Sequence, residues 1–121
     1  MESILQLEKL TIALLQYIDQ IVSHFERVKE SGVQGDFYLE VKPFADKVKE
    51  VNDEWKELVD KFILELTPAH IKLQQVASAY DQMEMISVQA FFPQTSRTRF
   101  INNVKSIRYI YTTLLEIIPN K

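Results

Sequence analysis

The sequence contains no cysteine, and only two glycines and four prolines occur among its 121 residues. Without cysteine the chain has no disulfides, no thiolate metal ligands and no cysteine nucleophile. The scarcity of glycine and proline argues against an all-β domain, which needs many turns, and favours a few long helices. Charged or amide side chains interrupt every apolar run before membrane-spanning length, and no cationic start leads into an apolar segment. We therefore expect a soluble cytoplasmic protein without a signal peptide and without a membrane partner.

Acidic and basic residues nearly balance, with 17 Asp and Glu against 14 Lys and Arg and a net charge of −3. Nucleic-acid-binding domains usually carry a basic surface, so we expect no nucleic-acid partner. Hydrophobic residues make up 46% and charged residues 26%, which is ordinary for a soluble globular protein. At this length we expect residues 1–121 to form a single domain with one core.

Apolar residues recur at spacings of three and four along four segments, which predicts four amphipathic helices. We predict these helices over residues 3–31, 37–66, 68–92 and 96–118. Short connections make sequential helices antiparallel, so the predicted fold is an all-α, four-helix, up-and-down antiparallel bundle. The clearest apolar seam is that of the first helix, which consists of Ile4, Leu7, Thr11, Leu14, Ile18, Ile21, Phe25 and Val28.

Turn and capping residues mark the predicted helix ends. Gly32 stands where a helix C-cap favours a left-handed residue, and Asp36 can cap the second helix. We interpret Thr67 and Pro68 as the cap and the first position of the third helix. Pro43 lies inside the second segment, and the pattern leaves open whether it kinks one helix or restarts the helix after a short turn.

The sequence has no combination of residues that is typical of a catalytic or metal site. Neither His24 nor His70 follows a carboxylate by three residues, as in the Glu-x-x-His pairs of di-iron bundles. Neither a glycine-rich phosphate loop nor a serine elbow occurs. The predicted core seams contain no ionisable residue except tyrosine, and buried ionisable groups are the usual source of catalytic acids and bases. We therefore expect no enzymatic activity, no metal and no other cofactor.

The outer face of the third helix is poor in charge, since only Asp81 and Glu84 are charged between residues 73 and 96. Protein interfaces are depleted in charge and enriched in methionine and aromatic residues. This face is our first candidate for binding an unidentified protein partner or for self-association as a homodimer, and a solvated uncharged face is the alternative. The residues of this candidate interface are Gln74, Ser78, Gln82, Met85, Gln89 and Phe92.

A stripe of carboxylates follows the second helix at spacings of four and three. Like charges at these spacings destabilise a helix slightly, and the intervening lysines relieve part of that cost. The stripe is either a docking surface for a basic partner or the solvated outer face of the helix. It consists of Asp46, Glu50, Asp53, Glu57 and Asp60.

Residues 97–121 are basic, with five Lys and Arg against one Glu. Arg97 and Arg99 stand at the start of the fourth helix, which Ser96 or Thr95 caps, and Arg108 follows further along. Backbone N–H groups at a helix N-terminus together with guanidinium groups can hold a phosphate or carboxylate. The three arginines are therefore a candidate anion site, and ion pairs with acidic residues of another helix are the alternative. A pocket among aromatic residues between helix ends is a second place for a small ligand.

Short motifs in the chain resemble those of the YppE-like family, which comprises small uncharacterised proteins of low-GC Gram-positive bacteria. The motifs are Asp36–Phe37–Tyr38, Val41–Lys42–Pro43, Trp55 and Arg99–Phe100. The resemblance covers nearly the whole chain and implies a cytoplasmic four-helix bundle, with no activity and no binding residues assigned. We interpret the aromatic and proline positions of these motifs as packing and kink features. The expected function is a non-enzymatic protein-interaction or structural bundle, and small-ligand or anion binding near the start of the fourth helix is the alternative.

Overall fold

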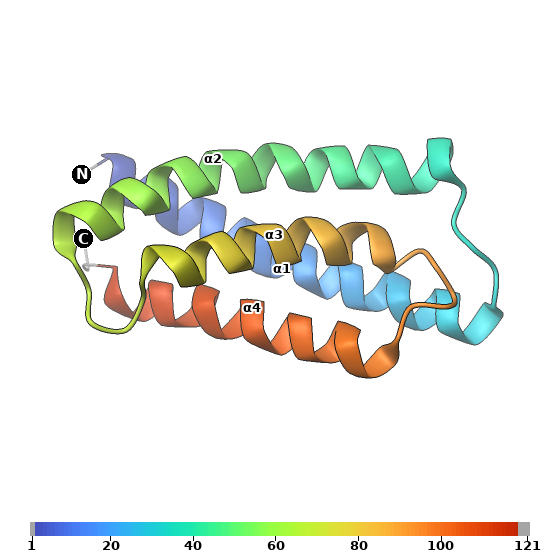
Figure 1. Cartoon of the computed structure of the whole chain (residues 1–121). Helices are drawn as coiled ribbons and strands as arrows, with labels where there is room; N and C mark the ends of the chain where they lie inside the picture. Colours follow the sequence, from blue (N-terminus) through green and yellow to red (C-terminus); the bar gives the residue numbers. More distant parts are fainter. Residues whose placement is uncertain (1, 119–121) are drawn as a thin grey trace.

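The computed structural model describes residues 2–118 and consists of long helices joined by short connections. The helices are α1 (Glu2–Ser31), α2 (Lys42–Leu66), α3 (Leu73–Gln89) and α4 (Arg97–Ile117), and a π-helical turn, η1 (Phe37–Val41), precedes α2. Figure 1 shows each helix antiparallel to the one before it, and α1 also packs against α4 to close the bundle. The prediction of an all-α, four-helix, up-and-down bundle is confirmed.

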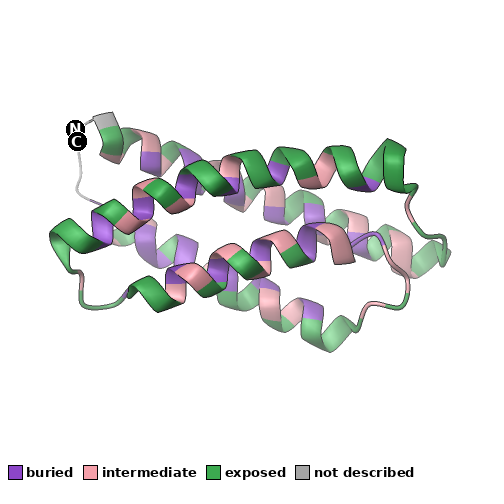
Figure 2. Cartoon of the chain, turned by 45° about the horizontal axis from the view of Figure 1, so that its top comes forward, coloured by how far each residue is buried: buried purple, intermediate pink, exposed green. Residues whose placement is uncertain are grey.

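The apolar stripes of the helices face one another and form a continuous core, with the buried residues on the inner faces (Figure 2). The seam predicted for α1 is buried from Leu7 to Phe25, and in α4 a stripe at the same spacings is buried from Phe100 to Ile118. The rings of Phe25 and Phe100 stack with their centroids 3.9 Å apart. Burying one large apolar side chain contributes about 1.5–3 kcal/mol, so helix packing is the main source of stability.

Caps define three helix boundaries as predicted. Gly32 follows α1 in the left-handed conformation, with φ of 70°. The carboxylate of Asp36 accepts a hydrogen bond from the backbone N–H of Leu39 at 2.8 Å and starts η1. The hydroxyl of Ser96 accepts a hydrogen bond from the backbone N–H of Arg99 at 3.3 Å and starts α4. Each cap satisfies a backbone group that the helix itself leaves unpaired.

The predicted second helix, residues 37–66, is divided just before Pro43. Phe37–Val41 forms one π-helical turn, and the α-helix begins at Lys42 with Pro43 in its first turn. Proline is tolerated there because the first turn of a helix leaves its N–H groups without intrahelical partners. Of the two alternatives, Pro43 marks a restart of the helix and not a kink within it.

The predicted start of the third helix at residue 68 is wrong. Thr67 adopts the left-handed conformation, with φ of 40°, and its backbone N–H donates to the carbonyl of Ile63 at 2.8 Å. Thr67 therefore ends α2 and does not cap the helix that follows. The connection after it is anchored by the buried side chain of Ile71, and α3 begins at Leu73.

The predicted end of the third helix at residue 92 is also too late, since α3 ends at Gln89. Phe91 is buried in the turn that follows, and Phe92 lies outside the helix. Leu66 and Leu73 flank the α2–α3 connection and are exposed. Among residues 2–118, no helix combines the length and the hydropathy that a membrane span requires.

Candidate functional site

The connection between α1 and α2 exposes four large hydrophobic side chains. Leu39 is 80% exposed, Tyr38 77%, Val33 67% and Phe37 53%. Single exposed hydrophobic residues are common on protein surfaces, whereas grouped ones mark binding sites. We call Val33, Phe37, Tyr38 and Leu39 the apical patch, after the end of the bundle where the α1–α2 and α3–α4 connections both lie (Figure 1).

The π-helical turn explains why the patch is exposed. The carbonyl of Asp36 accepts hydrogen bonds from the backbone N–H groups of Glu40 at 2.9 Å and Val41 at 3.0 Å. Within this turn only Val41 is buried. The carboxylate of Glu40 accepts from the backbone N–H of Asp36 at 3.1 Å, so the turn is closed from both sides. The backbone thus holds the apolar residues in place without burying them.

The interpretation of Phe37 and Tyr38 as packing residues is wrong. Successive residues of a helix point about 100° apart, so the consecutive apolar residues Phe37, Tyr38 and Leu39 cannot all face one core. The rings of Phe37 and Tyr38 contact each other edge to face, with centroids 5.1 Å apart. A run of three large apolar residues directly before a helix start was the signal in the sequence that could have revealed this patch.

A cavity of about 620 Å³ lies at the same end of the molecule and shares Val33 with the apical patch. We call it the apical cavity. Its walls come from the last turns of α1, the loop after them, η1 and the α3–α4 turn. The wall residues that matter below are His24, Arg27, Glu30, Gly35, Glu40 and Phe91.

Close contact between the two apical connections shapes this cavity. The backbone N–H of Gly35 donates to the carbonyl of Phe91 at 2.9 Å. A Cβ atom on Gly35 would lie 2.7 Å from Cδ1 of Phe91, so only glycine permits this approach. The ammonium group of Lys29 adds a hydrogen bond to the carbonyl of Pro93 at 2.8 Å. The α1–α2 loop is thereby fixed against the α3–α4 turn.

His24 lies between two phenylalanine rings at the cavity. Its ring centroid is 5.1 Å from that of Phe44 and 4.7 Å from that of Phe91. Burial lowers the pKa of His24, the nearby guanidinium of Arg27 lowers it further, and Glu40 acts in the opposite direction. A guanidinium of Arg27 also contacts Nδ1 of His24, which must then act as the acceptor. His24 is therefore neutral at neutral pH.

The cavity wall presents charges of both signs. Neither Arg27 nor Glu30 forms an ion pair with any residue between positions 2 and 118, although both are exposed. Glu40 adds a second carboxylate. Across the described part of the chain, no group of three or more His, Cys, Asp or Glu residues is arranged to hold a metal ion. An apolar patch beside a cavity with mixed charges can supply contact area and orienting polar contacts.

The three arginines of the candidate anion site are not brought together. Arg97 pairs with Glu26 of α1 at 3.0 Å, and Arg108 pairs with Asp19 of α1 at 3.2 Å. Arg108 lies eleven residues after Arg97, which is about 16 Å along the helix. The backbone N–H of Arg99 is occupied by the Ser96 cap. Ion pairing with another helix, the alternative given by the sequence, is observed for Arg97 and Arg108.

The outer face of α3 is only partly a free surface. Gln74, Ser78 and Met85 are exposed. The side-chain amide of Gln82, in contrast, hydrogen-bonds Asn103 of α4 at 3.3 Å. Of the remaining residues in that set, Gln89 is half-buried and Phe92 lies in the turn after the helix.

The acidic stripe of α2 is partly neutralised by lysines one turn before it along the same helix. The pairs are Lys42 with Asp46 at 2.8 Å, Lys49 with Asp53 at 3.3 Å and Lys56 with Asp60 at 2.6 Å. Such surface pairs contribute at most about 1 kcal/mol each. Asp46, Glu50 and Glu57 are exposed, whereas Asp60 is half-buried and Asp53 also contacts Tyr80 of α3.

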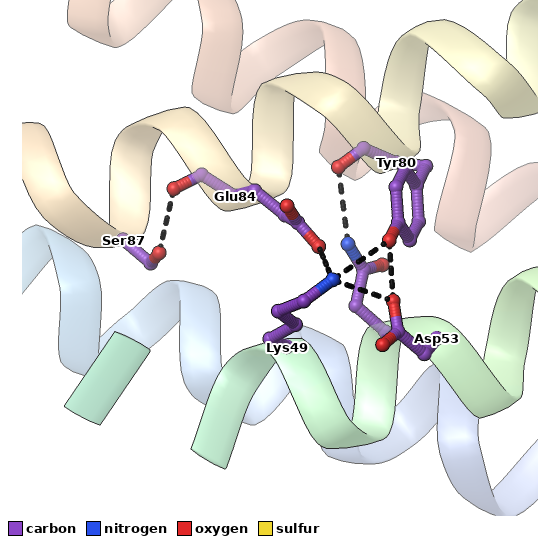
Figure 3. Close-up of polar contacts among 6 residues, drawn as sticks. Lys49, Asp53, Tyr80, Glu84 and Ser87 are labelled. Atoms are coloured by element: carbon purple, nitrogen blue, oxygen red, sulfur yellow. Dashed lines mark hydrogen bonds and ion pairs between the residues drawn. The ribbon is translucent and has the colours of Figure 1, made fainter. Parts of the chain in front are cut away.

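A polar cluster connects α2 to α3 midway along the bundle (Figure 3). The ammonium of Lys49 lies 3.4 Å from the hydroxyl of Tyr80 and 3.5 Å from the carboxylate of Glu84, and the Tyr80 hydroxyl donates to Asp53. The Asp53 contact and burial raise the pKa of Tyr80 to about 12, and the contacts with Tyr80 and Asp53 raise the pKa of Lys49. Next to Asp53 in the sequence, the buried side-chain amide of Asn52 donates a hydrogen bond to the backbone carbonyl of Tyr80 at 3.0 Å. The cluster joins two helices and is a structural feature.

Comparison with known proteins identifies relatives without an assigned activity. Residues 11–118 match a bacterial domain of unknown function, DUF1798. A protein of unknown function from Listeria innocua has a similar structure (TM-score 0.91, 24% identity, 96% of this chain and 93% of that chain covered). A DUF1798 domain from Staphylococcus aureus also has a similar structure (TM-score 0.86, 26% identity, 93% of this chain and 96% of that chain covered). The same holds for YppE from Bacillus subtilis (TM-score 0.85, 18% identity, 91% of this chain and 89% of that chain covered). No curated protein matches the sequence.

Proposed function

The chain belongs to the DUF1798 family of bacterial domains of unknown function, and on this premise we propose that it is a non-enzymatic, cytoplasmic protein that binds a protein partner through the apical patch and the apical cavity. The likeness to YppE predicted from the sequence motifs is confirmed by the structural match. The family assigns no activity, so the proposal is argued from the surface itself.

The observation that carries the proposal is the exposure of four large apolar side chains: Phe37, Tyr38 and Leu39 lie on the closed turn η1, and Val33 lies in the loop before it. Removing apolar surface from water is worth roughly 25 cal/mol per Å². Covering Tyr38 and Leu39 is therefore a favourable step for any partner with a matching surface. Because η1 is already closed by the Asp36 and Glu40 contacts, little conformational entropy is lost on binding.

The residue types in and around the patch favour protein binding over catalysis. The patch consists of aromatic and aliphatic residues, and the adjoining cavity is lined by a guanidinium and carboxylates. This is the arrangement of a protein interface, with an apolar centre and a polar rim. The side chain of His24 is held by Arg27 and by two phenylalanine rings, which gives it a structural role in the cavity wall.

The proposal can be tested by site-specific photo-crosslinking in the bacterium that produces the protein. Tyr38 is replaced by a photoreactive phenylalanine derivative, and Tyr109 of α4, which is also exposed, is replaced as the matched control. We expect a discrete cross-linked protein from position 38 and none from position 109. Equal cross-linking at both positions, or none at position 38, would contradict the proposal.

The outer face of α3 is the second candidate surface for the same function. Met85 is exposed on it, and methionine is enriched at interfaces. A photoreactive residue at position 85 therefore belongs in the same experiment. Cross-links from position 85 in place of position 38 would move the proposed interface to α3.

A further inference from the structure

We propose that the partner of the apical surface is a second copy of this chain, in a twofold dimer where the apical patch of each copy enters the apical cavity of the other. This inference rests on the proposed function, because it names the partner of the same surface. Two properties of that surface carry it: a projection that lies beside a hollow, and charges of opposite sign that form no ion pair with the described residues.

The first property is shape. A twofold interface uses the same surface on both copies, so that surface must be complementary to itself. A projecting group next to a hollow satisfies this condition, because each copy then offers what the other needs. Val33 belongs both to the patch and to the cavity wall, and Glu40 on the wall directly follows Leu39 of the patch. The patch and the cavity are therefore adjacent on each copy, so a twofold rotation can place each patch at the cavity of the other copy.

The cavity walls suit the residues that would enter. Two aromatic rings, those of His24 and Phe91, stand on the wall, and the patch offers the rings of Phe37 and Tyr38. Aromatic pairs gain from offset and edge-to-face contacts beyond the area that they bury. The rings of the wall are fixed by Phe44 and by the Gly35 contact, so the hollow is preformed.

The second property is charge. Arg27 and Glu30 lie on the same cavity wall, and each lacks an ion-pair partner among residues 2–118. In a twofold dimer Arg27 of one copy can meet Glu30 of the other, and the symmetry makes this contact twice. A surface of a single sign would repel its own copy, whereas a mixed surface is complementary to itself.

Sedimentation equilibrium of the full chain, from micromolar to millimolar concentration, tests the dimer. We expect the mass to rise from 14.2 kDa toward twice that value across this concentration range. Leu39→Asp should weaken association roughly tenfold or more. Met85→Asp on α3 is the matched control and should leave it unchanged. A monomer at millimolar concentration, or loss of the dimer with Met85→Asp alone, overturns the inference.

Charge exchange tests the twofold geometry. Arg27→Glu and Glu30→Arg should each weaken self-association severalfold, because each places like charges opposite one another. An equimolar mixture of the two variants should associate, and the double variant should regain the native affinity, because both signs are again present across the interface. Arg27 and Glu30 are both exposed, and helicity by circular dichroism verifies folding of the variants. A double variant that stays as weak as the single ones overturns the inference.

Failure of this inference can be separated from failure of the proposed function. If the chain is monomeric while position 38 cross-links a different protein, the dimer is excluded and the interaction surface stands. If position 38 cross-links no protein at all and the chain is monomeric, both are excluded. Cross-linking of position 38 to the chain itself supports both.

Discussion

The indole N–H of Trp55 donates a hydrogen bond to the hydroxyl of Thr11, 3.0 Å away, and neither residue has any exposed surface. The hydroxyl of Thr11 in turn donates a hydrogen bond to the backbone carbonyl of Leu7 at 2.7 Å. The contact joins α2 to α1 inside a mainly apolar core. Sliding one helix by a single residue would move the two atoms by about 1.5 Å and break the bond, so this pair helps to set the helix register.

Trp55→Ala should lower the free energy of unfolding by about 3–5 kcal/mol, because it empties a large core volume. Urea denaturation followed by circular dichroism measures the change. Thr11→Val, which keeps the shape but leaves the indole N–H unpaired, should cost about 1–3 kcal/mol and serves to separate the hydrogen bond from the packing. A cost below about 1 kcal/mol for Trp55→Ala would be incompatible with its core position.

Gly35→Ala should destabilise the protein by about 1–3 kcal/mol, because the added Cβ would lie 2.7 Å from Cδ1 of Phe91. Phe91 is itself buried and has little room to move. The same denaturation experiment provides the measurement, with Gln34→Ala in the exposed part of the loop as the control. Equal stability of Gly35→Ala and Gln34→Ala would show that the loop does not rest on Phe91.

Acidification should weaken the fold through His24. Its pKa is lowered below 6.5 in the folded chain, so the unfolded chain binds the proton more tightly. The contribution of neutral His24 to the stability of the fold is fully present above about pH 6.5. It is lost as the pH falls through the lower pKa of the folded chain. Thermal unfolding between about pH 8 and pH 5 should show a falling midpoint, and His24→Phe should flatten that part of the curve. An unchanged slope in His24→Phe would assign the effect to other groups.

Tyr111→Phe should leave stability unchanged or raise it by up to about 1 kcal/mol. The hydroxyl of Tyr111 is buried without a hydrogen-bond partner among the described residues, and burial raises its pKa. Phenylalanine keeps the edge-to-face contact with Trp55, whose ring centroid is 5.1 Å away. Tyr80→Phe is the contrasting control, because the Tyr80 hydroxyl donates to Asp53, and it should cost about 0.5–1.5 kcal/mol.

Phosphate binding at the start of α4 should depend on Glu26. Its carboxylate holds Arg97 at 3.0 Å and competes with any anion for the guanidinium. We therefore expect millimolar phosphate to raise the melting temperature of Glu26→Gln more than that of the native chain, since a ligand of the folded state stabilises it. Arg99→Gln in the Glu26→Gln background is the control. No shift in either protein would remove the anion site from consideration.

The helices and their inner faces were largely predictable from the sequence. The seams of α1 and α4 follow from the spacing of apolar residues, because a regular helix brings every third or fourth residue to the same side. Capping was predictable at Gly32, Asp36 and Ser96 for the same reason, since it depends on neighbours in the chain. These features require no knowledge of distant residues.

The boundary at Thr67 and the apical site were not predictable in this way. A Thr-Pro pair can end one helix or begin another, and the left-handed conformation of Thr67 decides between them. The burial of Asn52 depends on its bond to the carbonyl of Tyr80, 28 positions further along the chain. The consecutive apolar residues Phe37, Tyr38 and Leu39 indicate that not all three can face the core, but only the structure shows that all three lie outside it.

The sequence by itself determined that this chain forms four antiparallel helices and which faces of α1 and α4 are buried, because those properties arise from local spacing and caps. Only the tertiary structure decided that Gly35 rests on Phe91 and that Arg97 pairs with Glu26. Both contacts join residues more than 50 positions apart, which meet only because the helices pack side by side in the bundle. The apical patch and the apical cavity form where segments that are distant in the sequence pack together.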